Sequence, residues 1–418
     1  MKPTVAKTLI VLAVTIVALL GTLLYAAKLH RVAVNAPKLT IAVNSSDRAL
    51  SETNQQRETV ALPRVSVIIP AYNEADNIEA CILSVLQEPV LPPEHLEVWV
   101  LDDQSSDATL AIAQALQQSL NDPRLRVLTG KPRPDQQTWM GKNWACVQAA
   151  TYATGEFLLF LDADVRLKPG AIGAAIEIVE EKHVGLLTLC PEVVCGCLAE
   201  WLVQPWMMSL LMAGFDFNEV NDPNAEAAFA AGMFMCFRRT AYEQVGGHQA
   251  VADQAVEDVE LARRLKQQGL KLYYAVGANL ASVRMYRSLA AVWEGWTKNW
   301  HLGSRRNLST SLFSATIMLW VCVLPWLGLV TLLYQGATVG LTLLNVLAIA
   351  IALTAIAMQY RIRCSIERVA AIPPRYWWLT GIGGLLVAAI ALVSIIKTET
   401  GWGWTWRGRS LQLPDKSK

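Results

Sequence analysis

Acidic and amide residues cluster at three points in the first half of the chain, each directly after a short apolar run. These clusters are Ala71-Tyr72-Asn73-Glu74, Asp102-Asp103-Gln104-Ser105-Ser106-Asp107 and Asp162-Ala163-Asp164. Any one acidic residue here could instead cap a helix or close a turn. If the three clusters lie close together, their carboxylates repel one another unless a cation or hydrogen-bond donors neutralise them. Carboxylate and amide oxygens are hard ligands, which suit Mg²⁺ or Mn²⁺ carrying phosphates. The sequence therefore predicts a magnesium or manganese site for a phosphate-bearing ligand.

A cation on the protein should also contact these phosphates. The chain contains neither a GxxxxGK[ST] nor a GxGxxG phosphate-binding loop. The phosphates must then be held by the metal ion and by nearby basic side chains, of which Lys142 is the candidate.

Strands and helices alternate around the acidic clusters. Strands are expected over 65–69, 97–101, 125–128 and 157–161, and helices over 75–86, 108–119 and 143–152. Strands that alternate with helices of this length are typical of βαβ units and a parallel sheet. Ligands of such sheets bind at the carboxyl ends of the strands, which is where all three clusters fall.

Six motifs, taken together and in this order, resemble those of the family 2 glycosyltransferases. They are residues 65–74 and 101–107, Gly141-Lys142, Asp162-Ala163-Asp164, Gly246-Gly247 and residues 256–264, the last containing Glu257-Asp258. The resemblance covers residues 64–275. It implies a GT-A fold, which is a Rossmann-like α/β catalytic domain with a mostly parallel sheet.

The resemblance also implies roles for individual residues. Ala71, Tyr72, Asn73, Glu74 and Asp103 would hold the nucleoside of a UDP- or GDP-sugar, and Lys142 and Asp162 its diphosphate. Asp164, together with Asp162, would bind Mg²⁺ or Mn²⁺. Glu257 and Asp258 would form the catalytic ED motif, with Asp258 as the base.

The role of Asp258 has a chemical reason beside the resemblance. A hydroxyl that attacks an anomeric carbon must lose its proton, and one carboxylate base suffices for inversion. Glycoside hydrolases instead need two carboxylates around the scissile bond. Glu257 and Asp258 could also simply begin the helix expected over 258–267, because the helix dipole favours acidic residues there. The two interpretations are compatible.

The composition indicates a membrane protein with a separate polar part. Hydrophobic residues make up 53% of the 418 residues and charged residues 17%, whereas soluble proteins carry about 25% charged residues. A net charge of +1 gives no basic footprint for nucleic acid. Residues 8–27 are long enough to cross a bilayer, and we expect an uncleaved anchor there rather than a signal peptide.

Three further apolar stretches follow residue 307. We expect crossings over 311–334 and 338–358, separated by a break at Gln335-Gly336, and a third over 377–396. The third could instead be a bent, re-entrant hairpin, because its Gly381-Ile382-Gly383-Gly384 run permits a bend. Ten of the 15 Trp residues lie after position 290, many near the ends of these stretches, as interfacial Trp residues do.

Short-loop charge predicts the orientation. Residues 361–376 carry four Arg against one Glu, which places this loop, and with it the catalytic domain, on the cytoplasmic side. The expected organisation is an anchor (1–30), a linker (31–63), the GT-A domain (64–300), a membrane domain of two or three helices (301–400) and an interfacial tail (401–418).

Two apolar segments of the catalytic region predict an apolar acceptor. Residues 201–215 carry no charged side chain. They either line a lipid path at the membrane interface or form a buried helix of the catalytic domain. Residues 229–237 are apolar and rich in Phe and Met, which suits a lipid better than a polysaccharide.

The sequence also bears on how often transfer is repeated. Processive relatives carry a QxxRW pattern where this chain has Trp296-Thr-Lys-Asn-Trp300. The layout most resembles the carotenoid and hopanoid-associated glycosyltransferases of the family. We therefore expect transfer of one sugar to the hydroxyl of a carotenoid or other lipid. The alternatives are a processive polysaccharide synthase and a membrane protein that binds nucleotide sugars without catalysis.

Overall fold

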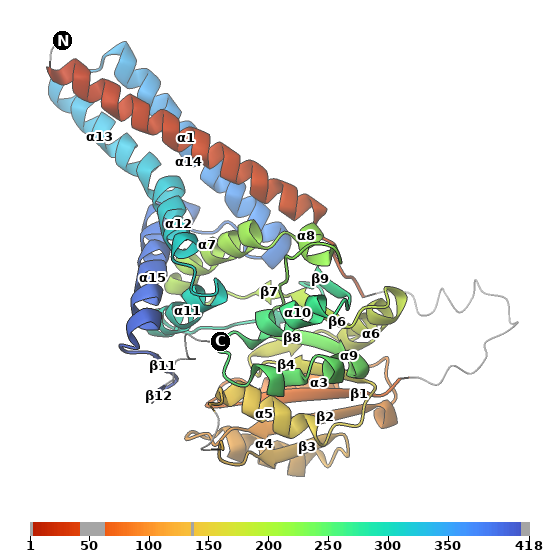
Figure 1. Ribbon diagram of the computed structural model, residues 1–418. Coiled ribbons are helices and arrows are strands. Elements are labelled where there is room, and N and C mark those ends of the chain that lie inside the picture. The colour runs from red at the N-terminus through yellow and green to blue at the C-terminus, as the bar shows by residue number, and fades with distance from the viewer. Residues whose placement is uncertain (1–2, 42–62, 135–137, 411–418) are drawn as a thin grey trace, which may run out of the picture. The chain divides into compact units, whose positions relative to one another are not determined.

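The computed structural model describes residues 3–41, 63–134 and 138–410. These residues divide into two compact units (Figure 1). The α/β unit contains the described residues between Pro37 and Glu192 and between Phe217 and Arg284. The helical unit contains those up to Ala36, between Val193 and Asp216, and from Met285 onward.

The α/β unit is built on a seven-stranded sheet of order β3-β2-β1-β4-β8-β6-β9. Its strands are β1 (Val65–Ala71), β2 (Leu96–Asp102), β3 (Leu125–Thr129), β4 (Phe157–Leu161), β6 (Leu186–Cys190), β8 (Phe234–Arg238) and β9 (Leu272–Val276). All neighbours pair in parallel except β8, which is antiparallel to β4 and β6. The predicted mostly parallel α/β fold is thus confirmed.

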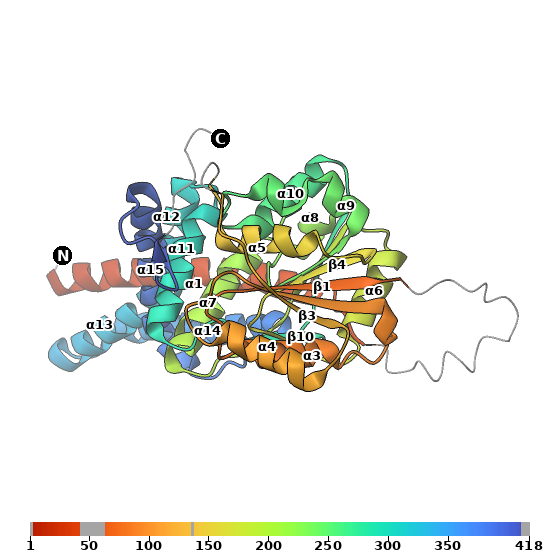
Figure 2. The same ribbon diagram turned by 90° about the horizontal axis from the view of Figure 1, so that it is seen from below.

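Burial explains the composition of the central strands. Every residue of β4, Phe-Leu-Leu-Phe-Leu, is buried, and β1 is buried at all but one position. Near-continuous apolar runs are typical of strands covered on both faces. Figure 2 shows this covering, with α5 on one side of β1 and α3 and α4 on the other.

The remaining elements of this unit are short. The helices are α3 (Ile78–Leu86), α4 (Thr109–Leu120), α5 (Gly141–Ala150), α6 (Ala171–Glu181), α8 (Phe217–Asn221), α9 (Arg239–Gln244) and α10 (Glu257–Gln267), with 3₁₀ turns η1 (Pro93–His95) and η2 (Gly247–Val251). Strand β5 (Val165–Leu167) pairs with β10 (Ala281–Val283), and β7 (Glu192–Val193) falls where the chain passes between the units. Helix α3 begins later than the expected residue 75, because residues 74–77 form a turn closed by the Asn77 N–H on the Glu74 carbonyl (2.8 Å).

The predicted linker is only partly described, since residues 42–62 lie outside the described residues. Helix α1 (Pro3–Asn35) continues past residue 30. Beyond it, the Leu39 N–H donates to the Val276 carbonyl (2.9 Å) and the Val276 N–H to the Pro37 carbonyl (2.8 Å). Residues 37–39 therefore pair with β9, whose outer side is an edge of the sheet with backbone groups to satisfy.

The helical unit consists of long apolar helices. They are α1, α7 (Leu198–Gly214), α11 (Leu289–Gly303), α12 (Leu308–Met318), the π-helical turn η3 (Leu319–Val323), α13 (Leu324–Val339), α14 (Leu343–Ala370) and α15 (Thr380–Thr400), with the turn η4 (Trp377–Leu379) and strands β11 (Thr405–Trp406) and β12 (Arg409–Ser410). Within the described residues, four stretches are long and apolar enough to cross a membrane: Thr8–Asn35, Leu308–Val339, Leu343–Ala370 and Trp377–Thr400.

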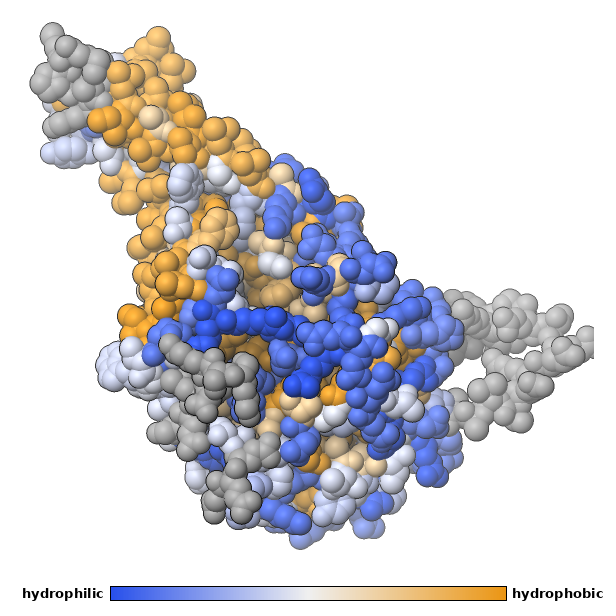
Figure 3. Space-filling view, viewed as in Figure 1, coloured by the Kyte–Doolittle hydropathy of each residue, from blue (hydrophilic) through white to orange (hydrophobic). Residues whose placement is uncertain are grey.

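The outer faces of these helices are apolar, which indicates association with a membrane. Leu24 and Leu343 keep 74% and 77% of their surface exposed. Apolar residues predominate on the long helices of this unit in the view of Figure 3. Exposed apolar surface of this extent is unfavourable in water and expected in lipid.

One buried glutamine satisfies the backbone at the π-helical turn. Pro325 has no N–H, so the Val321 carbonyl lacks its helical donor. Gln359 of α14 supplies one through Nε2 (2.8 Å), while its Oε1 accepts from Trp326 Nε1 (2.9 Å). Gln359, a polar residue in the apolar helix α14, thus pairs with polar groups of the neighbouring helix.

The predicted break at Gln335-Gly336 is wrong. The helix continues through both residues to Val339, and the turn comes at Gly340, whose φ of 93° suits glycine. The bent, re-entrant hairpin that was the alternative for the last apolar stretch is not formed, because α15 is a continuous helix. Its glycines serve close packing instead: a Cβ on Gly383 would overlap the Leu202 carbonyl, and one on Gly384 would overlap Cys322.

Helix α7 is the charge-free segment for which two positions were expected. It is buried along most of its length, and it packs against α1, α11, α14 and α15 within the helical unit. Its polar groups find partners there, with Gln204 Oε1 accepting from Trp296 Nε1 (2.6 Å) and Ser209 Oγ from the Tyr25 hydroxyl (2.9 Å). The segment is therefore a buried helix, but one of the helical unit rather than of the α/β unit.

The packing of α15 gives a first prediction. Gly384→Ala should destabilise the helical unit by about 1–3 kcal/mol, because the new methyl group overpacks against Cys322 and the Met318 carbonyl. The matched control is Gly381→Ala on the same helix, where the nearest atom would be 3.5 Å away. The control should keep or raise the midpoint of thermal unfolding in detergent, followed by Trp fluorescence. Equal midpoints for the two variants would contradict this role of Gly384.

Candidate active site

The sheet brings the predicted clusters to one edge. Strands β2, β1 and β4 are neighbours and parallel, so residues 71–74, 102–107 and 162–164 all follow carboxyl ends on the same side. Asn73 adopts a positive φ of 52°. Its backbone N–H donates to Ser105 Oγ (2.9 Å), and its side-chain Oδ1 accepts from the Ser106 backbone N–H (2.9 Å). The first two clusters are thus joined directly.

Asp103 lies buried beside the first two strands. Its Oδ2 accepts from Arg133 Nη2 at 3.2 Å, and its N–H donates to the Ala71 carbonyl. A Cβ on Gly141 would come within 2.8 Å of Arg133 and closer still to Asp103, so glycine at 141 leaves space for this ion pair. Sequence reasoning missed Arg133, although a basic loop directly after β3 was a signal that could have identified it.

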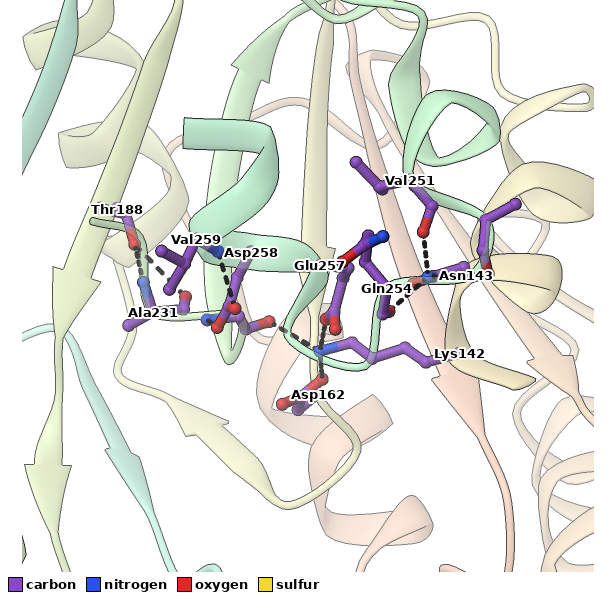
Figure 4. Close-up of polar contacts among 12 residues, drawn as sticks. Lys142, Asn143, Asp162, Thr188, Ala231, Val251, Gln254, Glu257, Asp258 and Val259 are labelled. Atoms are coloured by element: carbon purple, nitrogen blue, oxygen red, sulfur yellow. Dashed lines mark hydrogen bonds and ion pairs between the residues drawn. The ribbon is translucent and has the colours of Figure 1, made fainter. Parts of the chain in front are cut away.

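Lys142 is the centre of the second half of the site (Figure 4). Its Nζ lies 2.6 Å from Asp162 Oδ1 and 2.8 Å from Glu257 Oε1, and it donates to the Gly232 carbonyl at 3.2 Å. The next residue, Asn143, is fully buried, and its amide donates to the carbonyls of residues 251, 252 and 254. Together they connect the start of α5 to β4, to the segment before β8 and to the start of α10.

Asp258 lies in the first turn of α10 and is held by backbone N–H groups. Its Oδ2 accepts from Gly232 at 2.8 Å and its Oδ1 from Val259 at 2.8 Å. Thr188 fixes the segment on the other side, since its Oγ1 accepts from the Ala231 N–H (2.8 Å). A Cβ on Gly232 would be 2.8 Å from Asp258 Oδ2, so only glycine permits this approach.

The charges of the cluster shift one another's pKa values. Burial lowers the pKa of Lys142, but Asp162, Glu257 and Asp258 outweigh it and hold that pKa well above its ordinary value. Burial raises the pKa of Glu257, yet the Lys142 ammonium brings it below its ordinary value. For Asp258, burial and the Glu257 charge raise the pKa to about 7. The site thus contains one carboxylate that stays ionised and one poised to exchange a proton near neutral pH.

The chemistry of the donor atoms fits a hard divalent cation. Asp162 and Asp164 follow β4 two residues apart, and both side chains are partly exposed. Among the residues that the structure describes, no group of three or more His, Cys, Asp or Glu side chains is arranged to hold a metal ion. Two carboxylates suit Mg²⁺ or Mn²⁺, which keep several waters and take further oxygens from phosphates.

The Gly246-Gly247 motif has a structural explanation. Both residues have positive φ, of 79° and 51°, and a Cβ on Gly247 would lie 2.5 Å from the Tyr242 ring. Tyr242 in turn contacts His248 Nδ1 through its hydroxyl (2.9 Å). Burial lowers the pKa of His248 to about 3, so this histidine stays neutral and packs behind the site.

The chain is similar in sequence to known glycosyltransferases. The model of the family "Glycosyl transferase family 2" matches residues 66–246, and that of "Glycosyl transferase family group 2" matches residues 157–363. The chain is 27% identical to the 4,4'-diaponeurosporenoate glycosyltransferase of Staphylococcus haemolyticus over 69% of this chain and 74% of that protein. It is also 27% identical to the enzyme of the same name from Staphylococcus aureus strain MRSA252, over 66% of this chain and 71% of that protein.

A solved structure shares the fold. The mannosyltransferase PcManGT of Pyrobaculum calidifontis, determined in complex with GDP-Man and Mn²⁺, superposes with a TM-score of 0.53. The match covers 94% of this chain and 99% of that chain at 18% identity. At this identity the likeness concerns the fold alone.

The raised pKa of Asp258 gives a second prediction. The folded protein binds this proton more tightly than the unfolded chain, so the stabilisation is complete below about pH 4 and is lost as pH rises through 7. The Asn side chain of Asp258→Asn stays neutral, so the variant does not lose this stabilisation. Relative to the wild type, its free energy of unfolding should rise by about 2 kcal/mol between these two pH values. The pKa shift alone would give a larger rise, but the Asp258 side chain keeps some exposure to solvent. Unfolding midpoints measured from pH 4 to 8 test this.

The control for that series is Asp122→Asn. Asp122 pairs with Arg124 at 2.7 Å, and this bond lowers its pKa below the ordinary value. The stabilisation by the Asp122 carboxylate is present above pH 4 and is lost only as the pH falls further. Asp122→Asn should therefore be less stable than the wild type, by an amount that does not change between pH 4 and 7. A difference between Asp258→Asn and wild type that stays constant with pH would contradict the assignment.

Proposed function

Since this chain belongs to glycosyltransferase family 2, we propose that it transfers a single sugar, with inversion, from a nucleotide-diphosphate sugar to the hydroxyl of an apolar acceptor, a carotenoid or another lipid. The observation that carries the proposal is the cluster around Lys142. It joins Asp162 at the end of β4 to Glu257 and to Asp258 at the start of α10. One cluster thus holds the groups for the leaving diphosphate and for the attacking hydroxyl.

The first two strand ends would hold the nucleoside. Ala71, Tyr72, Asn73, Glu74 and Asp103 line this part of the edge. The Asn73 links to Ser105 and Ser106 keep the two loops in a fixed arrangement. The proposed donor is a UDP- or GDP-sugar, and the PcManGT complex with GDP-Man supports a nucleotide-diphosphate donor.

The diphosphate would lie between Lys142 and the carboxylates of Asp162 and Asp164. Mg²⁺ or Mn²⁺ bound to Asp164 and Asp162 would neutralise the charge that develops on the leaving diphosphate. The Mn²⁺ in the PcManGT complex supports this cofactor. Lys142 contributes a positive charge that is kept by its raised pKa, and Glu257 holds the ammonium through its 2.8 Å contact.

Asp258 would accept the proton of the acceptor hydroxyl. A pKa of about 7 is suited to a general base at neutral pH, because the group is partly ionised and still basic. The Gly232 N–H fixes the direction of Oδ2, so the carboxylate does not need to reorganise during transfer. A single base that activates the hydroxyl on the face opposite the leaving group accounts for inversion.

The helical unit would bring the acceptor to the enzyme. Its four long apolar helices are consistent with a multi-pass membrane protein, and the Arg residues near the end of α14 favour a cytoplasmic catalytic unit. Both relatives compared above are named for a carotenoid-type acceptor, which supports a pigment or similar lipid.

The direct test is transfer by the purified full chain in nanodiscs. UDP- and GDP-sugars are supplied with a polyene alcohol, and the products are analysed by mass spectrometry and NMR. Addition of one sugar with inverted anomeric configuration is expected. Long polymers would indicate a processive synthase, and donor binding without hydrolysis or transfer would indicate a binding protein.

The acceptor group itself gives a third prediction. The compound in the relatives' names, 4,4'-diaponeurosporenoate, ends in "-oate", the suffix of a carboxylate. A carboxylate is already ionised at neutral pH and needs no base, whereas a hydroxyl does. Asp258→Asn should therefore lower kcat with a polyene alcohol by about 10²–10⁴-fold, and by less than tenfold with the corresponding polyene acid.

The matched control is Glu260→Gln, on the same helix but paired with Arg263 (3.4 Å). It should keep activity with both acceptors. Full turnover of Asp258→Asn with the alcohol would refute the role of Asp258. Equal large losses with both acceptors would show that the carboxylate does more than accept a proton.

A further inference from the structure

We propose that Lys142 keeps the divalent cation out of the donor-free site, so that the cation binds tightly only together with the nucleotide diphosphate. This inference rests on the proposed function, because it concerns the same donor site. It adds an order of events: the diphosphate must draw the ammonium away from Asp162 before the cation can use that carboxylate.

Lys142 has as many acceptors within the protein as its ammonium has N–H groups. An ammonium has three N–H donors, and Lys142 has three acceptors: Asp162 Oδ1 at 2.6 Å, Glu257 Oε1 at 2.8 Å and the Gly232 carbonyl at 3.2 Å. No donor remains for a phosphate. A diphosphate can therefore be bound by Lys142 only if the ammonium leaves one of these partners.

Asp162 is the partner that the ammonium can most readily leave. Its side chain is 33% exposed, whereas that of Glu257 is 8% exposed. Released into solvent, Asp162 is rehydrated, while a released Glu257 would stay buried without its counter-charge. Glu257 and Gly232 can thus hold the ammonium on one side while it turns from Asp162 towards a phosphate.

Only the side chain needs to move. Asn143 anchors the first turn of α5 through three carbonyl contacts and is fully buried. The Lys142 side chain, in contrast, is 29% exposed. The backbone of the site is therefore already in place, and the change is confined to a flexible four-carbon chain.

Before the donor arrives, ammonium and cation compete for the same carboxylate. A divalent cation on Asp162 would lie close to a positive charge that is only 2.6 Å from Oδ1, and like charges at this range repel. The described residues offer no third acidic ligand to compensate. A diphosphate removes both difficulties, since it attracts the ammonium and supplies the missing oxygens.

The test measures Mn²⁺ binding rather than activity. The full chain in nanodiscs is titrated with Mn²⁺, and free Mn²⁺ is followed by electron paramagnetic resonance, with and without UDP or GDP. For the wild type we expect at least tenfold tighter Mn²⁺ binding when the nucleotide is present. For Lys142→Gln, Mn²⁺ alone should bind at least tenfold tighter than to the wild type, while the nucleotide binds more weakly.

In Lys142→Gln the affinity for Mn²⁺ should rise while the affinity for the nucleotide falls. A misfolded site would instead lower both affinities, so this result distinguishes the proposed role from a structural one. Lys142→Arg keeps the charge and should retain the dependence of Mn²⁺ on nucleotide. Lys168→Gln is the matched control: it removes one charge from the same unit, at a lysine paired with Glu192 (3.2 Å), and should behave as the wild type. Asp164→Asn should weaken Mn²⁺ under both conditions.

Two results would overturn the inference alone, provided that the enzyme binds nucleotide and transfers sugar: wild-type Mn²⁺ affinity that does not depend on nucleotide, or no gain in Mn²⁺ affinity for Lys142→Gln. Failure of both UDP and GDP to bind, with or without Mn²⁺, would overturn the proposed function and this inference with it.

Discussion

The α/β unit depends on one interaction, the neutralisation of several carboxylates by a single ammonium. Asp162 follows β4, whereas Glu257 and Asp258 begin α10, and all three carboxylates raise the pKa of Lys142. The Lys142 ammonium offsets the repulsion between these carboxylates, through its contacts with Asp162 and Glu257. The ammonium that contacts these carboxylates is also the group that we propose for binding the diphosphate.

Small residues and backbone contacts make this arrangement possible. Gly232 allows its own peptide to contact both Asp258 and Lys142, and Gly141 leaves room for the ion pair of Asp103. Thr188 and Asn143 hold the two segments that carry these groups. Much of the site's geometry is therefore set by residues for which no catalytic role is proposed. The glycines allow close approach of other groups, and Asn143 and Thr188 form hydrogen bonds with the backbone.

The helical unit follows a second constraint, that polar groups within apolar helices must find partners inside the protein. Gln359 compensates for the N–H that Pro325 lacks, and Tyr25 meets Ser209 on the buried helix α7. Gly383 and Gly384 let α15 approach α7 and the π-helical turn closely. The many apolar residues of the chain thus form a packed helical unit, and α7 belongs to this unit rather than to the α/β unit.

The sequence by itself determined the class of fold, the family and the positions of the acidic clusters. Apolar runs of strand length followed by carboxylates, and long stretches without charge, are local features that can be recognised one segment at a time. The tertiary structure alone decided which of these groups meet. Lys142 was expected at a phosphate, yet its partners include the Gly232 carbonyl, 90 residues along the chain. Arg133, the place of α7, the pairing of residues 37–39 with β9 and the true helix end at Gly340 likewise followed from packing, because such contacts depend on surfaces that form only when distant segments fold together.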